Sequence, residues 1–144
     1  MRHVSDVRLT SANELDSLCG IIKQSKSLTK MRLVSTCLDD TGASAIASAI
    51  KHSHSLTTVD LSSSVVGDIG ASAIAEAIAQ SKSLTHVNVS FDALCYDGVV
   101  ALAEAIKQNT SLPSVTLWSN PIGPYVAAAE VIQKQNNSLV AVNV

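Results

Sequence analysis

A unit of about 28 residues repeats along this chain of 144 residues, and no other feature constrains the fold as strongly. The dipeptide Ser-Leu recurs at intervals of 28, 28, 28 and 27 residues, with its leucines at Leu28, Leu56, Leu84, Leu112 and Leu139. Each leucine opens the pattern apolar-x-x-apolar-x-apolar, as in Leu28, Met31 and Leu33, and an earlier copy begins at Val4. The alternation in this pattern predicts six short strands, each with one buried face.

The stretches between the strand signals have the spacing of a helix. In residues 42–50, glycine, alanine and isoleucine fall at i, i+3, i+4, i+7 and i+8, which makes one apolar stripe. The same stripe recurs in residues 70–78 and 98–106, and weaker copies lie in residues 18–22 and 127–132. We therefore expect five helices. Asp40 and Asp68 precede two of them at equivalent positions and are predicted to be their N-caps.

Alternating strands and helices predict an α/β fold in which successive units stack side by side. Parallel strands stack about 4.8 Å apart and helices about 10 Å apart, so the stack curves with the parallel β-sheet on the concave side and the helices on the convex side. We expect a single domain, residues 1–144, whose strands start near residues 4, 28, 56, 84, 112 and 139. An uncapped end of this stack would allow a homo-oligomer to form there.

The units, such as residues 55–78, resemble leucine-rich repeats of the ribonuclease-inhibitor-like subfamily, and the resemblance extends from Val4 to Val144. It implies a right-handed leucine-rich-repeat solenoid, a short horseshoe arc, and a non-catalytic protein-protein interaction module that binds a protein partner through its concave face. The ninth position of that repeat is usually Asn or Cys, whose side chain bonds the loop backbone. Here the position holds Thr36, Ser64, Asp92 and Asn120, and only Asn120 follows the family pattern.

Composition excludes several classes of partner. The formal net charge of −2 argues against a nucleic-acid binder, which needs a basic surface. No apolar run approaches the ~20 residues that cross a bilayer, and the first residues lack the apolar stretch of a signal peptide. We expect a cytoplasmic protein without a cofactor, with delivery as an effector by a specialised secretion route as the alternative. Cys19, Cys37 and Cys95 have no CxxC spacing and are predicted to be reduced thiols.

Two short motifs could indicate a metal or phosphate site, but the repeat explains both. His52 and His54 form an H-x-H pair, yet they align with glutamine and lysine in the neighbouring units, as expected for the surface end of a helix. Residues 67–70, Gly-Asp-Ile-Gly, lack the Lys-Ser/Thr of a phosphate-binding loop. We therefore expect no metal site and no phosphate site.

A catalytic triad could be drawn from Asp60, His86 and Ser62, which the repeat places on neighbouring strands of the concave face. No nucleophile elbow or oxyanion loop accompanies these residues, and an open sheet excludes little water. The sequence therefore predicts a protein that is not an enzyme.

The candidate binding site lies on the concave face, where the third, fifth and seventh residues of each strand pattern point. Trp118 occupies a seventh position that holds threonine, valine or serine in the other units, so the core does not require its bulk. The aromatic Phe91 follows the seventh position of the preceding unit. We predict a partner-binding site made of Trp118, Phe91, Asn88, His86, Asp60 and Arg32. Alternatively, Trp118 packs over Pro121 and Tyr125 and shields the irregular fifth unit.

Other functions remain open at this stage. Similar repeats occur in Ran GTPase-activating proteins and in actin-capping tropomodulins, so a GTPase-regulating or actin-regulating repeat domain is one alternative. A structural or oligomerising repeat fragment of a larger receptor or effector is another. The sequence does not identify the partner.

Overall fold

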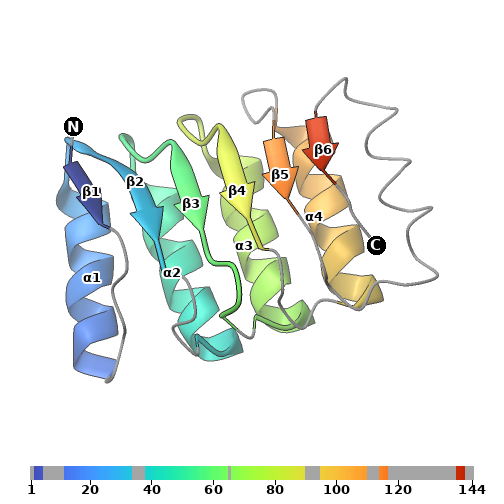
Figure 1. Cartoon of the computed structure of the whole chain (residues 1–144), viewed down its shortest axis with the longest axis horizontal. Coiled ribbons are helices and arrows are strands. Elements are labelled where there is room, and N and C mark those ends of the chain that lie inside the picture. Colours follow the sequence, from blue (N-terminus) through green and yellow to red (C-terminus); the bar gives the residue numbers. More distant parts are fainter. Residues whose placement is uncertain are drawn as a thin grey trace.

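The computed structural model describes residues 2–4, 12–33, 38–64, 66–89, 95–109, 114–116 and 139–141. In that part of the chain, strands and helices alternate as the repeat predicts (Figure 1). The elements are β1 (Arg2–Val4), α1 (Ala12–Gln24), β2 (Leu28–Arg32), α2 (Asp40–His52), β3 (Thr58–Asp60), α3 (Asp68–Gln80), β4 (His86–Asn88), α4 (Tyr96–Gln108), β5 (Ser114–Thr116) and β6 (Leu139–Ala141). The fifth helix predicted at residues 127–132 lies outside the described residues.

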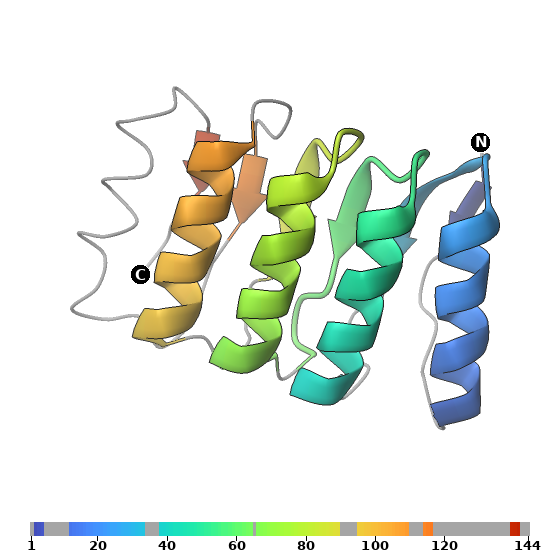
Figure 2. The ribbon, with the colours of Figure 1, turned by 180° about the vertical axis from the view of Figure 1, so that it is seen from behind.

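The six strands form one parallel sheet in the order β1-β2-β3-β4-β5-β6, so each strand pairs with the next one along the chain. Helices α1 to α4 stand side by side on one face of the sheet, as the views from the two sides show (Figures 1 and 2). The predicted solenoid, with its parallel sheet on one side and helices on the other, is confirmed. None of the described helices is long and apolar enough to cross a membrane.

The register of β1 differs from the sequence prediction. The predicted strand from Val4 to Leu9 would place Val7 opposite Met31, but the structure pairs Val4 with Met31. The first and the fourth positions of the strand pattern are both apolar, so Val4 satisfies either register. Within β1 the pairing also shifts by one residue between Arg2 and His3, as at a β-bulge.

The register of β6 also differs. The repeat predicted Val142 opposite Val115, whereas the structure pairs Val140 with Val115 and Ala141 with Thr116. A shift of two residues leaves the same side chains on each face of a strand. Since residues 140, 142 and 144 are all valine, the apolar pattern does not distinguish the two registers.

The core lies between the sheet and the helices, and its residues come from the predicted stripes. Leu28, Met31 and Leu33 of the strand pattern are buried, as are their equivalents in the next two units. On the helices, the buried face is displaced from the predicted stripe. Ala43, Ala71 and Val99 are fully buried although the stripe omits them, whereas three stripe residues are only partly buried: Ala45, Ala73 and Ala101. Ala43 lies against Gly70 and Ala71 against Gly98, each on the next helix.

Glycine permits this close approach of the helices. A Cβ atom at Gly98 would lie 2.6 Å from the carboxylate of Asp68 and 3.1 Å from the Cβ of Ala71, both on the preceding helix. At Gly70 it would lie 2.8 Å from the Cβ of Ala43. The glycines that open the stripes of α3 and α4 are therefore required by the neighbouring repeat.

Asp40 and Asp68 were predicted to cap their own helices, and this prediction is wrong. The N-cap of α2 is Asp39, which accepts a hydrogen bond of 2.8 Å from the backbone N–H of Gly42. Asp40 is the first residue of α2, and its Oδ1 accepts hydrogen bonds of 2.9 Å from the N–H groups of Gly67 and Gly70. Because the helix starts lie side by side, the carboxylate reaches the amino end of the next helix. Asp68 accepts in the same way from the N–H of Cys95, at 2.7 Å.

Small polar side chains also join successive repeats. The Thr57 hydroxyl donates to the carbonyl of Thr29 at 2.9 Å, and the Thr85 hydroxyl donates to that of Thr57 at 3.1 Å. Ser64, at the ninth repeat position, is fully buried and donates to the carbonyl of Leu33 at 2.5 Å. Serine thus fixes the loop to the preceding repeat at the position where the family usually has asparagine or cysteine.

Candidate protein-binding surface

The concave face carries two rows of polar side chains, which run across the sheet from strand to strand. Met31, Val59 and Val87 point into the core, so the residues that flank them in each strand point away from it. One row pairs Lys30 with Thr58 and Thr58 with His86, and the other pairs Arg32 with Asp60 and Asp60 with Asn88. Lys30, Arg32 and His86 are exposed, and the other three are partly buried.

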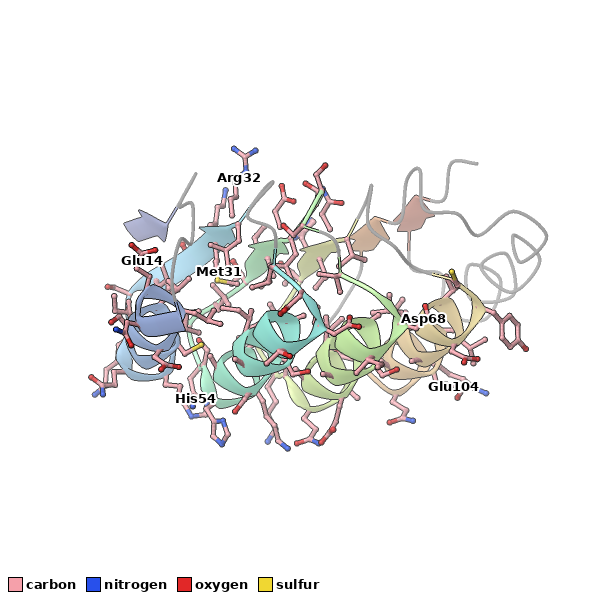
Figure 3. The ribbon with its side chains drawn as sticks, turned by 90° about the horizontal axis from the view of Figure 1, so that it is seen from below. Glu14, Met31, Arg32, His54, Asp68 and Glu104 are labelled. Carbon is pink, nitrogen blue, oxygen red and sulfur yellow. The ribbon has the colours of Figure 1, made fainter. Side chains whose placement is uncertain are left out.

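Arg32 and Asp60 form the ion pair of this surface. The Nε of Arg32 lies 3.5 Å from Oδ2 of Asp60, and the side chains are 52% and 18% exposed, respectively. Oδ1 of Asp60 accepts hydrogen bonds from the backbone N–H of Ser62, at 3.0 Å, and from its hydroxyl, at 2.7 Å. Asp60 is thereby fixed in place, and it orients an arginine whose side chain is half exposed. Figure 3 shows Arg32 extending from the strand side of the molecule, opposite the helices.

The residues considered for a catalytic triad do not form one. Asp60 bonds to Ser62 and to Arg32, whereas Nδ1 of His86 lies 2.8 Å from the hydroxyl of Thr85. The Ser62 hydroxyl donates to a carboxylate and lies beside no imidazole that the structure describes. The arrangement therefore provides no activated nucleophile.

The structure brings four of the six predicted site residues together on one face: Arg32, Asp60, His86 and Asn88. Trp118 and Phe91 lie outside the described residues, and their place in the site stays a prediction. Lys30 and Thr58 belong to the same rows but were not included in the predicted site. Their position in the repeat was the signal that could have identified them, since both occupy the third strand position, as His86 does.

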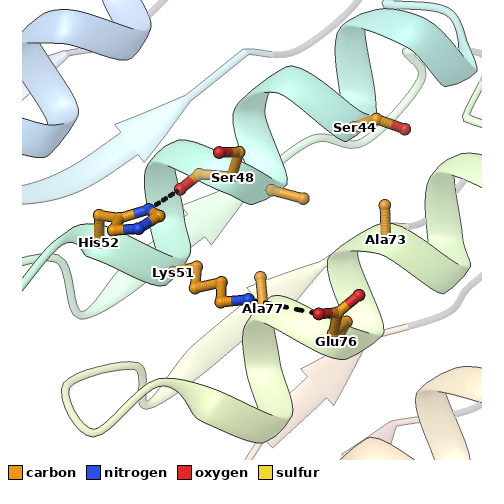
Figure 4. A pocket seen from close by; sticks show the side chains of 8 residues that line it. Ser44, Ser48, Lys51, His52, Ala73, Glu76 and Ala77 are labelled. Atoms are coloured by element: carbon orange, nitrogen blue, oxygen red, sulfur yellow. Dashed lines mark hydrogen bonds and ion pairs between the residues drawn. The ribbon is translucent and has the colours of Figure 1, made fainter.

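The opposite, helical side has a shallow groove of about 180 Å³ between α2 and α3 (Figure 4). An ion pair crosses this groove, with the Nζ of Lys51 3.3 Å from Oε1 of Glu76. The Nδ1 of His52 lies 2.7 Å from the carbonyl oxygen of Ser48. His52 therefore bonds to its own helix. Within the described part of the chain, no three potential metal ligands come together.

Comparison with known proteins agrees with this architecture. A family model described as a leucine-rich repeat matches residues 24–47 and 52–75. A solved structure of leiomodin-1 actin-binding site 2 superposes with a TM-score of 0.83 and 18% identity, covering 94% of this chain and 82% of the other. The tropomodulin C-terminal domain of Caenorhabditis elegans gives a TM-score of 0.74 and 17% identity, covering 94% and 83%. The search of curated proteins gave no match. At these identities the likeness shows the fold alone.

Proposed function

Since the chain is a leucine-rich-repeat protein, we propose that it is a non-catalytic protein-binding module that binds its partner through the concave face. The observation that carries this proposal is the array of aligned polar side chains on β2, β3 and β4, with the half-exposed Arg32 held by Asp60. Arginine is enriched among the residues that dominate binding energy at protein interfaces. A side chain that is already oriented also loses less conformational entropy on binding.

The pattern of charge indicates what the partner presents at this surface. Lys30 and Arg32 supply cations at β2, whereas β4 supplies the imidazole of His86 and the amide of Asn88. We therefore expect a carboxylate of the partner opposite β2 and neutral hydrogen-bonding groups opposite β4. Trp118 and Phe91 would add aromatic anchors beyond β4.

The hydrogen bonds of the polar side chains on this face also favour binding over catalysis. Asp60, His86 and Ser62 all bond to neighbours within the sheet or the following turn, and leucine-rich-repeat folds are typically non-enzymatic. Their side chains thus serve as a fixed surface.

The test is site-specific photocrosslinking of the full chain in an extract of its source cells. A photoreactive side chain replaces Thr58 on the concave face or, as the matched control, Ser72 on the exposed side of α3. We expect a discrete protein adduct from position 58 and none from position 72. The Arg32→Ala variant should then weaken binding of the purified partner by about tenfold or more. Adducts formed from position 72 alone would contradict the concave site.

Actin is a second candidate partner, supported by the fold shared with leiomodin-1 actin-binding site 2 over 94% of this chain. Co-sedimentation with filamentous actin and a pull-down with monomeric actin test it directly. Actin would be identified as the partner if the chain binds either form and the Arg32→Ala variant binds less. A GTPase-stimulation assay and light scattering test the GTPase-regulating and oligomerising alternatives.

A further inference from the structure

Charge is sorted between the two edges of the repeat stack. The acidic residues of the first helical turns, Glu14, Asp40, Asp68 and Asp97, lie at the edge where the helices begin. Basic side chains lie at the other edge, where the helices end: Lys23, Lys51 and Lys107 in last turns, and Lys26, Lys82 and the imidazole of His54 just beyond. The net charge of −2 conceals this separation.

Three successive turns at the second edge have the same design, a cation or imidazole between two serines. They are residues 25–27, 53–55 and 81–83, and in each the middle side chain is exposed. The flanking serines bond to backbone: Ser25 Oγ accepts from the N–H of Leu28 at 2.9 Å, and the Ser83 hydroxyl donates to the carbonyl of Leu56 at 2.8 Å. The serines therefore fix the turns, and the turns present Lys26, His54 and Lys82 to solvent.

A hollow of about 200 Å³ lies between two of these turns. It is lined by Lys51, Ser53, His54, Gln80, Lys82 and Ser83, and no carboxylate is among them. Lys51 is paired with Glu76 and Gln80 bonds to the same carboxylate, whereas Lys82 and His54 have no partner in the part of the chain that the structure describes. The Glu76 carboxylate beside the hollow is thus already engaged by Lys51 and Gln80, and Lys82 and His54 stay available to a ligand.

The helix dipole accounts for only part of this arrangement. Cations in the last turn of a helix, such as Lys51, are favoured by the partial negative charge at the carboxyl end, and this effect fades beyond that turn. His54 and Lys82 lie past the C-caps Ser53 and Ser81. Their shared position in the repeat, next to a hollow that no carboxylate lines, favours an anionic ligand.

We propose that this edge binds an acidic, extended peptide segment of a protein partner, with one carboxylate seated in the hollow beside Lys82 and His54. The turns connect the helices to the strands, so their spacing falls between that of the strands, about 4.8 Å, and that of the helices, about 10 Å. An extended peptide places alternate side chains on one face about 6.8 Å apart, within that range. Alternate acidic residues of the peptide therefore match Lys26, His54 and Lys82.

A peptide fits this edge better than a membrane or a nucleic acid does. The three turns contain only serine, lysine and histidine, so they offer no apolar side chain to enter a bilayer. A nucleic acid is bound through many phosphate contacts, and the three turns together supply only two lysines. This surface is separate from the concave face, and the proposal does not depend on the concave site.

The test uses fluorescence anisotropy with the full chain and a labelled synthetic peptide of about ten residues that alternates glutamate and serine. We expect saturable binding, absent for the peptide with glutamine in place of glutamate, and weaker for a peptide whose glutamates are contiguous. Lys82→Gln with His54→Gln should weaken binding about tenfold or more. The matched control, Lys107→Gln, removes a lysine of the same edge that does not line the hollow, and should change affinity less than about twofold.

Several outcomes would overturn the proposal. The first is that the peptide does not bind the wild-type chain. The second is that Lys107→Gln and the double variant lower the peptide affinity equally. The third is that the chain binds phosphatidylserine vesicles or an oligonucleotide more tightly than it binds the peptide. Should the double variant melt early, Lys82→Glu with a lysine-serine peptide provides a second test, because reversed charges should restore binding. Arg32→Ala should leave the peptide affinity unchanged. A loss of affinity from Arg32→Ala would assign the peptide to the concave face instead, so failure here and failure of the concave site are distinguishable.

Discussion

The carboxylate of Asp40 accepts a hydrogen bond of 2.9 Å from the backbone N–H of Gly70, thirty residues further along the chain. The same oxygen accepts from Gly67, so the first residue of α2 satisfies two free N–H groups at the start of α3. The Asp40 side chain, which the sequence pattern predicts to cap its own helix, therefore links two repeats. This link can be tested directly.

Asp40→Ala should lower the free energy of unfolding by about 1–2 kcal/mol, because two N–H groups of α3 lose a charged acceptor. The matched control is Asp97→Ala, which removes an exposed acidic residue from the first turn of α4. Its loss should change stability by less than about 0.5 kcal/mol. Urea denaturation followed by circular dichroism measures both. Equal effects would mean that Asp40 acts only through the helix dipole.

Gly98→Ala and Gly20→Ala should change stability in opposite directions. At Gly98 the added methyl group would meet the Asp68 carboxylate at 2.6 Å, and the backbone Cα of Asp68 at 3.2 Å, so the helices must separate. We expect a loss of about 1–3 kcal/mol. At Gly20, inside α1, nothing lies within 4 Å, and alanine should stabilise the helix by about 0.5–1 kcal/mol. Thermal melting of the two variants provides the comparison, and a destabilising Gly20→Ala would contradict the packing described here.

The two described cysteines should differ in reactivity. Burial raises the pKa of the Cys19 thiol above its ordinary value of 9.0, an effect that Lys23 opposes and Asp16 reinforces. Cys95 is exposed. In a Cys37→Ser background at pH 8, iodoacetamide should therefore label Cys95 in the folded protein and Cys19 only after denaturation. Mass spectrometry of tryptic peptides reports both sites, and rapid labelling of Cys19 would contradict its burial.

The same pKa shift predicts a loss of stability at alkaline pH. The thiol of Cys19 ionises at lower pH in the unfolded chain than in the folded one, so unfolding above pH 9 releases a proton. Its contribution is complete below that pH and is lost as pH rises through the folded pKa, with a slope of at most about 1.4 kcal/mol per pH unit. Cys19→Ala should reduce this slope above pH 9. Identical slopes for the two proteins would show that other groups cause the decline.

Trp118, the single tryptophan of the chain, should report on the concave site. If it anchors the partner, its emission in the free protein is red-shifted and readily quenched by acrylamide, and it moves to the blue on binding. Trp118→Ala then lowers partner affinity by about tenfold or more and leaves the melting temperature unchanged. A blue, poorly quenched emission in the free protein, with a lower melting temperature for the variant, would support packing over Pro121 and Tyr125 instead.

The internal repeat made the architecture predictable, because a strand pattern and a helix stripe recur with one period. The inner registers, such as Met31 opposite Val59, follow directly from adding 28 residues. The outer ones do not, since Val4 suits two apolar positions and the alternating valines after Leu139 suit two registers. In both places two strand registers fit the apolar pattern of the sequence equally well. Only the contacts with the neighbouring strand select one of the two pairings.

The candidate site was predictable in part for a related reason. Repeat position assigns Arg32, Asp60, His86 and Asn88 to one face, and the structure agrees. It says nothing about which side chains bond to each other, so the pairing of Asp60 with Ser62 and Arg32 was not foreseen. The long-range role of Asp40 was missed for the same reason, because helix-capping patterns describe contacts three residues apart and not thirty.

All four described helices run in the same direction across the sheet, so their dipoles add (Figure 1). The side chains oppose this sum with full charges, carboxylates where the helices begin and ammonium groups where they end. Each helix end carries only about half an elementary charge, so the full charges of the side chains outweigh it. The molecule therefore has a positive end at the serine-flanked turns and a negative end where the helices begin. An acidic protein that diffuses toward it would be rotated before contact, which raises the association rate at low ionic strength and leaves the dissociation rate unchanged.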